Sequence, residues 1–210
     1  MTPWRFFIEH RSEIFSATLD HITLVVIAMV IAVAIAVPLG MLIVQHRHLR
    51  TIALGIASIF QTIPSLALFG FLIPIPFIGG IGRRTAIVAL VLYALLPILR
   101  NTYVGLTNID PAILEAAEAM GMTTTQVLLR VRFPLALSVI LAGIRTATVI
   151  TIGVATIAAA IGAGGLGTFI FRGVAMVSDS VILAGAIPAA LLAIFADLLL
   201  ALLERRLRVT

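Results

Sequence analysis

The residue types that carry most enzyme chemistry are scarce in this sequence. Its 210 residues include no cysteine, and all fourteen basic residues are arginine. The chain therefore has no thiolate nucleophile and no cysteine-based metal site, and it lacks the lysine that an ATP-binding phosphate loop requires. His46 and His48 flank Arg47, but two histidines alone rarely bind a metal, and we expect both at a membrane interface. The sequence predicts no catalytic residue and no metal site.

A glycine-rich stretch at residues 162–167 matches the pattern G-x-G-x-x-G. A dinucleotide site needs this pattern between a strand and a helix, with an acidic residue about twenty positions later. Here the pattern follows a long apolar segment, and the next acid, Asp179, comes too soon. The stretch therefore predicts a flexible turn at a membrane face.

The longest polar interruption runs from about residue 107 to residue 132. Asp110 followed by Pro111 is typical of a helix start, because the carboxylate caps free backbone N–H groups and proline suits the first turn. Gly121 follows the helix formers where a left-handed residue commonly ends a helix. Thr123 and Gln126 have the spacing of a capping box. Two short helices hinged at Gly121 are predicted, either as a docking surface or as an ordinary structured connector.

Polar groups also occur inside otherwise apolar segments. A proline and polar side chains at membrane depth are tolerated only where they are buried or face a cavity. One group of four such residues lies in the middle of the apolar segment 51–76. These residues either line a pathway or form hydrogen bonds between helices. The four residues are Gln61, Thr62, Pro64 and Ser65.

Arg145 is a further candidate for lining a pathway. It lies eleven residues beyond Pro134, which is about 16 Å along a helix. An ionisable group at such depth usually faces the bundle interior or water. It pairs with Asp197 if their helices are neighbours, and snorkelling to the interface is the alternative.

The elements that must position these residues are membrane-spanning helices. The chain is 61% hydrophobic and 11% charged, with a mean hydropathy of +1.22, whereas a soluble domain is about 45–50% apolar. A helix needs about 20 apolar residues to cross a bilayer. Five segments qualify: 21–44, 51–76, 85–106, 133–161 and 181–203. Residues 1–20 predict an N-terminal segment in the membrane interface, and 21–206 predict one transmembrane domain in an all-α, polytopic membrane protein.

The arginines predict the orientation. They are spread singly or in pairs between apolar segments, which argues against a nucleic-acid-binding face. Because cytoplasmic loops carry an excess of positive charge, the N-terminus is expected outside and the C-terminus inside. The cytoplasmic group is then Arg47, Arg50, Arg100, Arg130, Arg132, Arg205, Arg206 and Arg208, and the smaller outer group is Arg5, Arg11, Arg83, Arg84 and Arg172.

The polar loop resembles the EAA loop of bacterial ABC importer permeases. That family's pattern is E-A-A-x3-G-x9-I-x-L-P, in which apolar residues replace Ile and Leu here. The counterparts in this chain are Glu115, Ala116, Ala117, Gly121, Val131, Phe133 and Pro134. The resemblance implies that these residues form a cytoplasmic coupling loop, at about 107–132, that docks on ATPase subunits.

Residues 61–74, 142–167 and 185–188 are similar to osmoprotectant permeases, which import glycine betaine, carnitine, choline and related quaternary ammonium compounds. The resemblance implies a multi-pass permease of the bacterial cytoplasmic (inner) membrane that moves such a solute by alternating access and is not an enzyme. A permease for another small polar solute, such as an amino acid, is the alternative. A stand-alone ion-coupled carrier or channel is more remote. Such carriers normally have acids or histidines within their spans, and here only Asp197, near the end of a span, qualifies.

The resemblance also implies partners. Two cytoplasmic ABC ATPase subunits would bind ATP and Mg, so no cofactor is expected in this chain. A second permease chain, identical or homologous, would complete the pathway within the lipid bilayer. An extracytoplasmic substrate-binding protein would deliver the solute, and no nucleic acid is expected as a partner.

Overall fold

The computed structural model describes residues 3–207, and this part of the chain forms helices and no strand. The all-α prediction is confirmed. In chain order the elements are α1 (Pro3–Glu9), α2 (Arg11–Gln45), α3 (Arg47–Thr62), α4 (Ser65–Leu72), α5 (Arg83–Thr107), α6 (Pro111–Ala119), α7 (Thr124–Gln126), the π-helical turn η1 (Val127–Arg132), α8 (Phe133–Ile157), the 3-10 turn η2 (Ala158–Ile161), α9 (Gly167–Ala175) and α10 (Asp179–Arg206).

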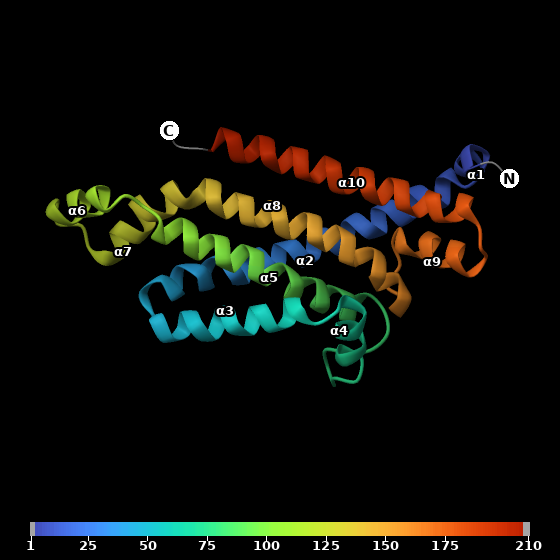
Figure 1. Cartoon of the computed structure of the whole chain (residues 1–210), viewed down its shortest axis with the longest axis horizontal. Helices are drawn as coiled ribbons and strands as arrows, with labels where there is room; N and C mark the ends of the chain where they lie inside the picture. Colours follow the sequence, from blue (N-terminus) through green and yellow to red (C-terminus); the bar gives the residue numbers. More distant parts are fainter. Residues whose placement is uncertain (1–2, 208–210) are drawn as a thin grey trace.

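The long helices run roughly along the longest axis of the molecule (Figure 1). The α2–α3 junction, α6, α7 and the last turn of α10 lie at one end, which we call the α6 end. Helices α1, α4 and α9 lie at the opposite end, the α9 end. Helices α2, α5 and α10 and the continuous run Thr124–Ile161 are each long and apolar enough to cross a membrane, and the bent pair of α3 and α4 forms either a broken span or a re-entrant loop. Within residues 3–207 the structure therefore has four candidate spans, or five if the bent pair crosses the membrane, which agrees with the predicted fold of about five transmembrane helices.

Helix α5 lies at the centre of the core, where it packs against both α2 and α8. Helix α2 meets it through a stripe of small residues. A Cβ atom at Gly40 would lie 2.4 Å from Thr102 Cγ2 of α5, so only glycine permits this approach. Small residues allow such close packing where lipid supplies no hydrophobic driving force. The other members of the stripe, all fully buried, are Ala28, Ala32 and Ala36.

The first membrane helix begins earlier than predicted. The predicted start was residue 21, whereas α2 runs without a break from Arg11. The chain breaks instead at His10, whose ring stacks on Phe6 with centroids 4.0 Å apart. The charged residues between positions 11 and 20 do not end the helix, because its other face is buried through Ile14 and Ala17. The interfacial position of the N-terminal segment stays a prediction.

The second predicted span, residues 51–76, is not one straight helix. Helices α3 and α4 are bent by 105° relative to each other. Pro64 has no N–H to donate and disfavours the helical conformation at Ile63, which is extended with φ −67° and ψ 128°. The hydroxyl of Tyr93 on α5 donates to the freed Ile63 carbonyl. This hydrogen bond satisfies a backbone acceptor that lipid could not satisfy.

The second half of the polar loop also differs from the prediction of two separate short helices. Helix α7 continues through η1 directly into α8. Pro134 has no N–H to offer the Arg130 carbonyl, and the wider turn pairs the Phe133 N–H with the Leu128 carbonyl instead. The loop is therefore one short helix, α6, followed by the first turns of a long one.

Candidate functional site

Helix α6 has sharply defined ends. The Asp110 Oδ1 atom accepts a hydrogen bond of 2.9 Å from the Ala112 N–H. At the other end, the Met122 N–H donates to the Ala117 carbonyl at 3.2 Å, and Gly121 has φ +77°. This is a Schellman ending, which requires a left-handed residue after the helix. The predicted start and stop of this helix are confirmed.

The chain after Gly121 is fixed by the predicted capping box and by one longer contact. The Thr123 N–H donates to Gln126 Oε1 at 2.8 Å, and the Gln126 N–H donates to Thr123 Oγ1 at 3.3 Å. In addition, Arg132 Nη1 donates to the Leu106 carbonyl at the end of α5, at 3.2 Å. This last bond, which the sequence did not reveal, links the helix after the loop to the helix before it.

Helix α6 exposes both of its acids, Glu115 and Glu118. Glu115, Ala116 and Ala119 are exposed, whereas Ala117 is buried against the body of the protein. Among the described residues, none forms a hydrogen bond or ion pair with the Glu115 carboxylate. Glu118 is exposed as well and lies at the edge of a crevice between α6, α2 and η1. The exposed face of α6 therefore combines negative charge with small side chains, and its role in docking stays a prediction.

The apolar members of the EAA pattern lie at the base of the loop. Val131 is in η1, and Phe133 and Pro134 begin α8; all three are half-buried. Phe133 packs against a buried cluster that includes Leu106 and Ala136. Helix α6 packs against η1, and the three apolar residues do not share its exposed face.

The four polar candidates of the second span lie at the break between α3 and α4. Helix α3 has 16 residues and rises about 24 Å from the α6 end, so the break lies nearer the α9 end than the predicted mid-span position. The Thr62 hydroxyl donates to the Ile59 carbonyl of its own helix at 2.8 Å. Thr62 and Pro64 are exposed in the single chain, and Gln61 and Ser65 are half-buried. Their role in lining a pathway stays a prediction.

Arg145 holds two carboxylates between α8 and α10. Its Nε atom lies 2.8 Å from Asp197 Oδ1, and its Nη1 atom lies 3.0 Å from Glu204 Oε2. The pairing with Asp197 is confirmed, and Glu204 was not predicted. The two acids are seven residues apart, which places them on one face of α10. One cation facing two acids leaves the cluster with an excess negative charge, while the lining role of Arg145 stays a prediction.

The glycine pattern at residues 162–167 forms a turn, as predicted, and follows a helix rather than a strand. Gly162, Gly164 and Gly165 have φ of 75°, 85° and 81°, a conformation that side chains disfavour. The turn leads into α9, a nine-residue helix that packs against α10. The prediction missed this helix.

Sequence reasoning also passed over His21, which is fully buried in α2. Its Nε2 atom lies 3.1 Å from the Ile152 carbonyl of α8. Because a carbonyl only accepts, this contact makes Nε2 the protonated nitrogen of the ring. The bond links α2 to α8, and a lone histidine beside an apolar run was the signal that could have revealed it.

The profile of the family described as "Binding-protein-dependent transport system inner membrane component" matches residues 32–209. The match covers most of the chain, and the chain belongs to this family. It is therefore a permease subunit of an ABC transporter, a translocation component of the inner membrane and not an enzyme.

Three similar proteins align with most of the chain. The carnitine transport permease protein OpuCD of Listeria monocytogenes is 50% identical over 188 residues, which are 89% of this chain and 83% of the relative. The osmoprotectant import permease protein OsmW of Salmonella typhimurium is 46% identical over 202 residues, 95% of this chain and 94% of the relative. The choline transport system permease protein OpuBB of Bacillus subtilis is 44% identical over 195 residues, 93% and 88% respectively.

Solved structures confirm the fold. A chain of the MetNI methionine ABC transporter in an inward-facing conformation superposes with a TM-score of 0.82 at 23% identity, over 92% of this chain and 95% of that one. A chain of an amino acid ABC transporter gives a TM-score of 0.78 at 19% identity, over 95% and 96%. At these identities the likeness concerns the fold and not the transported solute.

Proposed function

We propose that this chain is the translocation subunit of an importer for quaternary ammonium osmoprotectants of the glycine betaine, carnitine and choline type. The observation that carries the proposal is the near full-length identity of 42–50% to permeases named for these solutes. The solved amino acid transporters that resemble this chain are 19–23% identical to it, and at that identity they support the fold and not the solute. A carrier or channel that acts alone would leave the capped, exposed helix α6 without a use.

The shape of the chain supports the proposed assembly. Two ABC ATPase subunits, which bind ATP and Mg, dock at the α6 end, where Glu115 protrudes. This end then faces the cytoplasm, and a substrate-binding protein docks at the α9 end. A second permease chain, identical or homologous, completes the pathway, and apolar side chains of α10 meet this chain or lipid. Among these exposed side chains are Leu191, Phe195, Leu198 and Leu202.

We expect the substitution Gly121→Val to weaken coupling between ATP hydrolysis and transport. The residue has φ +77°, and no atom lies within 4 Å of an added Cβ, so the cost is backbone strain of about 1–2 kcal/mol in the left-handed conformation. That strain displaces α6 from its docking angle. Solute uptake per ATP hydrolysed, measured in proteoliposomes, should fall about tenfold.

Gly121→Asn is the matched control, because asparagine tolerates the left-handed conformation. It should keep most of the wild-type uptake per ATP. Equal uptake ratios for the valine variant and the wild type would show that the angle of α6 does not transmit ATPase closure.

The proposed solute class is tested with the reconstituted importer. The permease is combined in proteoliposomes with the ATPase and binding protein expected from neighbouring reading frames. With ATP available to the ATPase subunits, uptake of radiolabelled glycine betaine, carnitine or choline should exceed uptake without ATP, whereas methionine should not accumulate. ATP-dependent uptake of methionine and of none of the three quaternary ammonium compounds would establish the amino acid alternative.

A further inference from the structure

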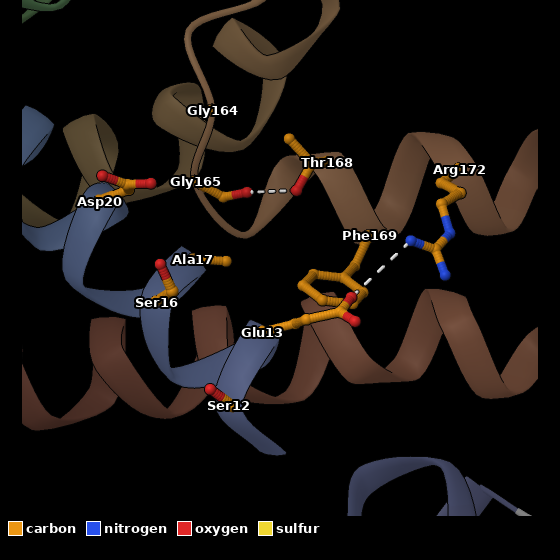
Figure 2. A pocket seen from close by; sticks show the side chains of 10 residues that line it. All are labelled: Ser12, Glu13, Ser16, Ala17, Asp20, Gly164, Gly165, Thr168, Phe169 and Arg172. Carbon is orange, nitrogen blue, oxygen red and sulfur yellow. Dashed lines mark hydrogen bonds and ion pairs between the residues drawn. The ribbon is translucent and has the colours of Figure 1, made fainter. Parts of the chain in front are cut away.

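A polar cavity opens at the α9 end, between the first turns of α2 and helix α9. Its volume is about 430 Å³, within the range of pockets that hold small ligands. Figure 2 shows the carboxylate of Glu13, the ring of Phe169 and the guanidinium of Arg172 together at one part of the cavity. Asp20 lies at another part, beside Gly164 and Gly165.

Glu13 and Arg172 are oppositely charged side chains of the cavity that do not form a close ion pair. Glu13 Oε2 and Arg172 Nη1 are 4.0 Å apart, which is too long for a hydrogen bond. Their side chains are 60% and 49% exposed, so a solute can reach both. Asp20 differs, because Arg83 holds it with a bond of 2.8 Å. Glu13 and Arg172 are therefore the pair with unused capacity.

Phe169 adds an aromatic ring to this pair. The side chain is largely buried in the protein yet contributes to the cavity wall. The Arg172 Cζ atom lies 5.9 Å from the ring centroid, within the distance at which a ring attracts a cation. A second cation that entered beside Glu13 would meet a carboxylate and an aromatic ring in the same region.

We propose that this cavity is a solute-binding site of the permease that recognises zwitterions carrying a quaternary ammonium group and a carboxylate. The ammonium group binds beside Glu13 and Phe169, and the carboxylate binds Arg172. Hydroxyl groups of Ser16 and Thr168 line the same space. This proposal rests on the proposed function, which supplies the solute class. It adds a selectivity for zwitterions over choline. Choline has no carboxylate and gains nothing from Arg172.

The absence of native cysteine allows a direct test by cysteine protection. The variant Ser16→Cys places a thiol in the cavity, and Ser178→Cys places one at the same end outside it. The permease and its ATPase subunits are reconstituted without binding protein, and the rate of reaction of this chain with a neutral maleimide is measured. Glycine betaine and carnitine should slow labelling at Ser16→Cys in a saturable way and leave Ser178→Cys unchanged.

Second substitutions assign the two charges. In the Ser16→Cys background, Arg172→Gln should raise the half-protecting concentration of glycine betaine and carnitine about tenfold or more, because a charge-assisted contact is lost, and should leave that of choline unchanged. Glu13→Gln should raise it for all three solutes. Arg172→Lys should restore part of the zwitterion protection. Glu9→Gln and Arg84→Gln, exposed charges outside the cavity, should change nothing.

The outcomes separate this site from the proposed function. If the complete importer transports glycine betaine but no solute protects Ser16→Cys, the site is wrong and the function stands. Equal effects of Arg172→Gln on glycine betaine and choline would also overturn the assignment of the carboxylate to Arg172. If the importer transports no quaternary ammonium compound, the proposed function itself fails.

Discussion

Glu115→Ala should release the ATPase subunits from the permease during purification in detergent. The Glu115 carboxylate protrudes from α6 beside small side chains and forms no ion pair or hydrogen bond with the described residues. We therefore expect an ATPase subunit to supply the group that binds it. Loss of one member of a buried charge-assisted contact costs about 2–5 kcal/mol, which weakens assembly about thirtyfold or more. The measurement is the ratio of ATPase to permease after size-exclusion chromatography.

Two control substitutions accompany Glu115→Ala. Glu9→Ala removes an exposed acid at the opposite end and should leave the ratio unchanged; among residues 3–207, Glu9 pairs with Arg5 across 3.9 Å. Glu118→Ala removes the acid that faces the crevice behind α6 and should have the smaller effect of the two α6 variants. A Glu115→Ala complex with full ATPase content and normal transport would show that ATPases dock elsewhere.

Arg145→Met should destabilise the permease by about 1–3 kcal/mol, between the cost of breaking an exposed ion pair and that of breaking a buried one. The substitution removes the only cation that contacts Asp197 and Glu204 in the described chain and leaves two carboxylates on one face of α10. The value lies between the two because the three side chains are 29–42% exposed. The measurement is the thermal unfolding midpoint of the purified protein, which should fall by several degrees.

The two acids provide the internal control for Arg145→Met. Adding Asp197→Asn and Glu204→Gln removes the unpaired charges, so the triple variant should recover most of the lost stability. Asp197→Asn alone leaves the Arg145–Glu204 pair intact and should cost little. A triple variant as unstable as Arg145→Met would mean that the arginine acts through packing and not through charge.

Features set by neighbouring residues were predictable from the sequence. The cap at Asp110, the left-handed stop at Gly121 and the capping box of Thr123 with Gln126 all form as predicted. Each depends on hydrogen bonds between residues a few positions apart, which the chain makes wherever it lies in the fold. The four long candidate spans were predictable for a similar reason, because hydropathy over a window of about 20 residues measures the cost of crossing lipid.

Some local consequences were misjudged because a neighbouring helix decides them. Pro64 indicated a disturbance in the second span, but it revealed neither the bend of 105° nor the Tyr93 hydroxyl that satisfies the freed carbonyl of Ile63. Pro134 indicated a helix start, whereas the chain absorbs the missing N–H in a π turn and continues from α7. A proline removes one hydrogen bond, and the surrounding packing determines how the chain compensates.

Only the tertiary structure brought distant residues together. Arg145 and Glu204 are 59 positions apart in the chain, and His21 and Ile152 are 131 positions apart. The cavity joins Glu13 at the start of α2 to Arg172 in α9. The sequence determined which side chains are charged and which helix face each occupies. Which faces meet depends on how closely helices approach, as at Gly40 against Thr102, and that is decided by the interlocking of side chains from all helices at once.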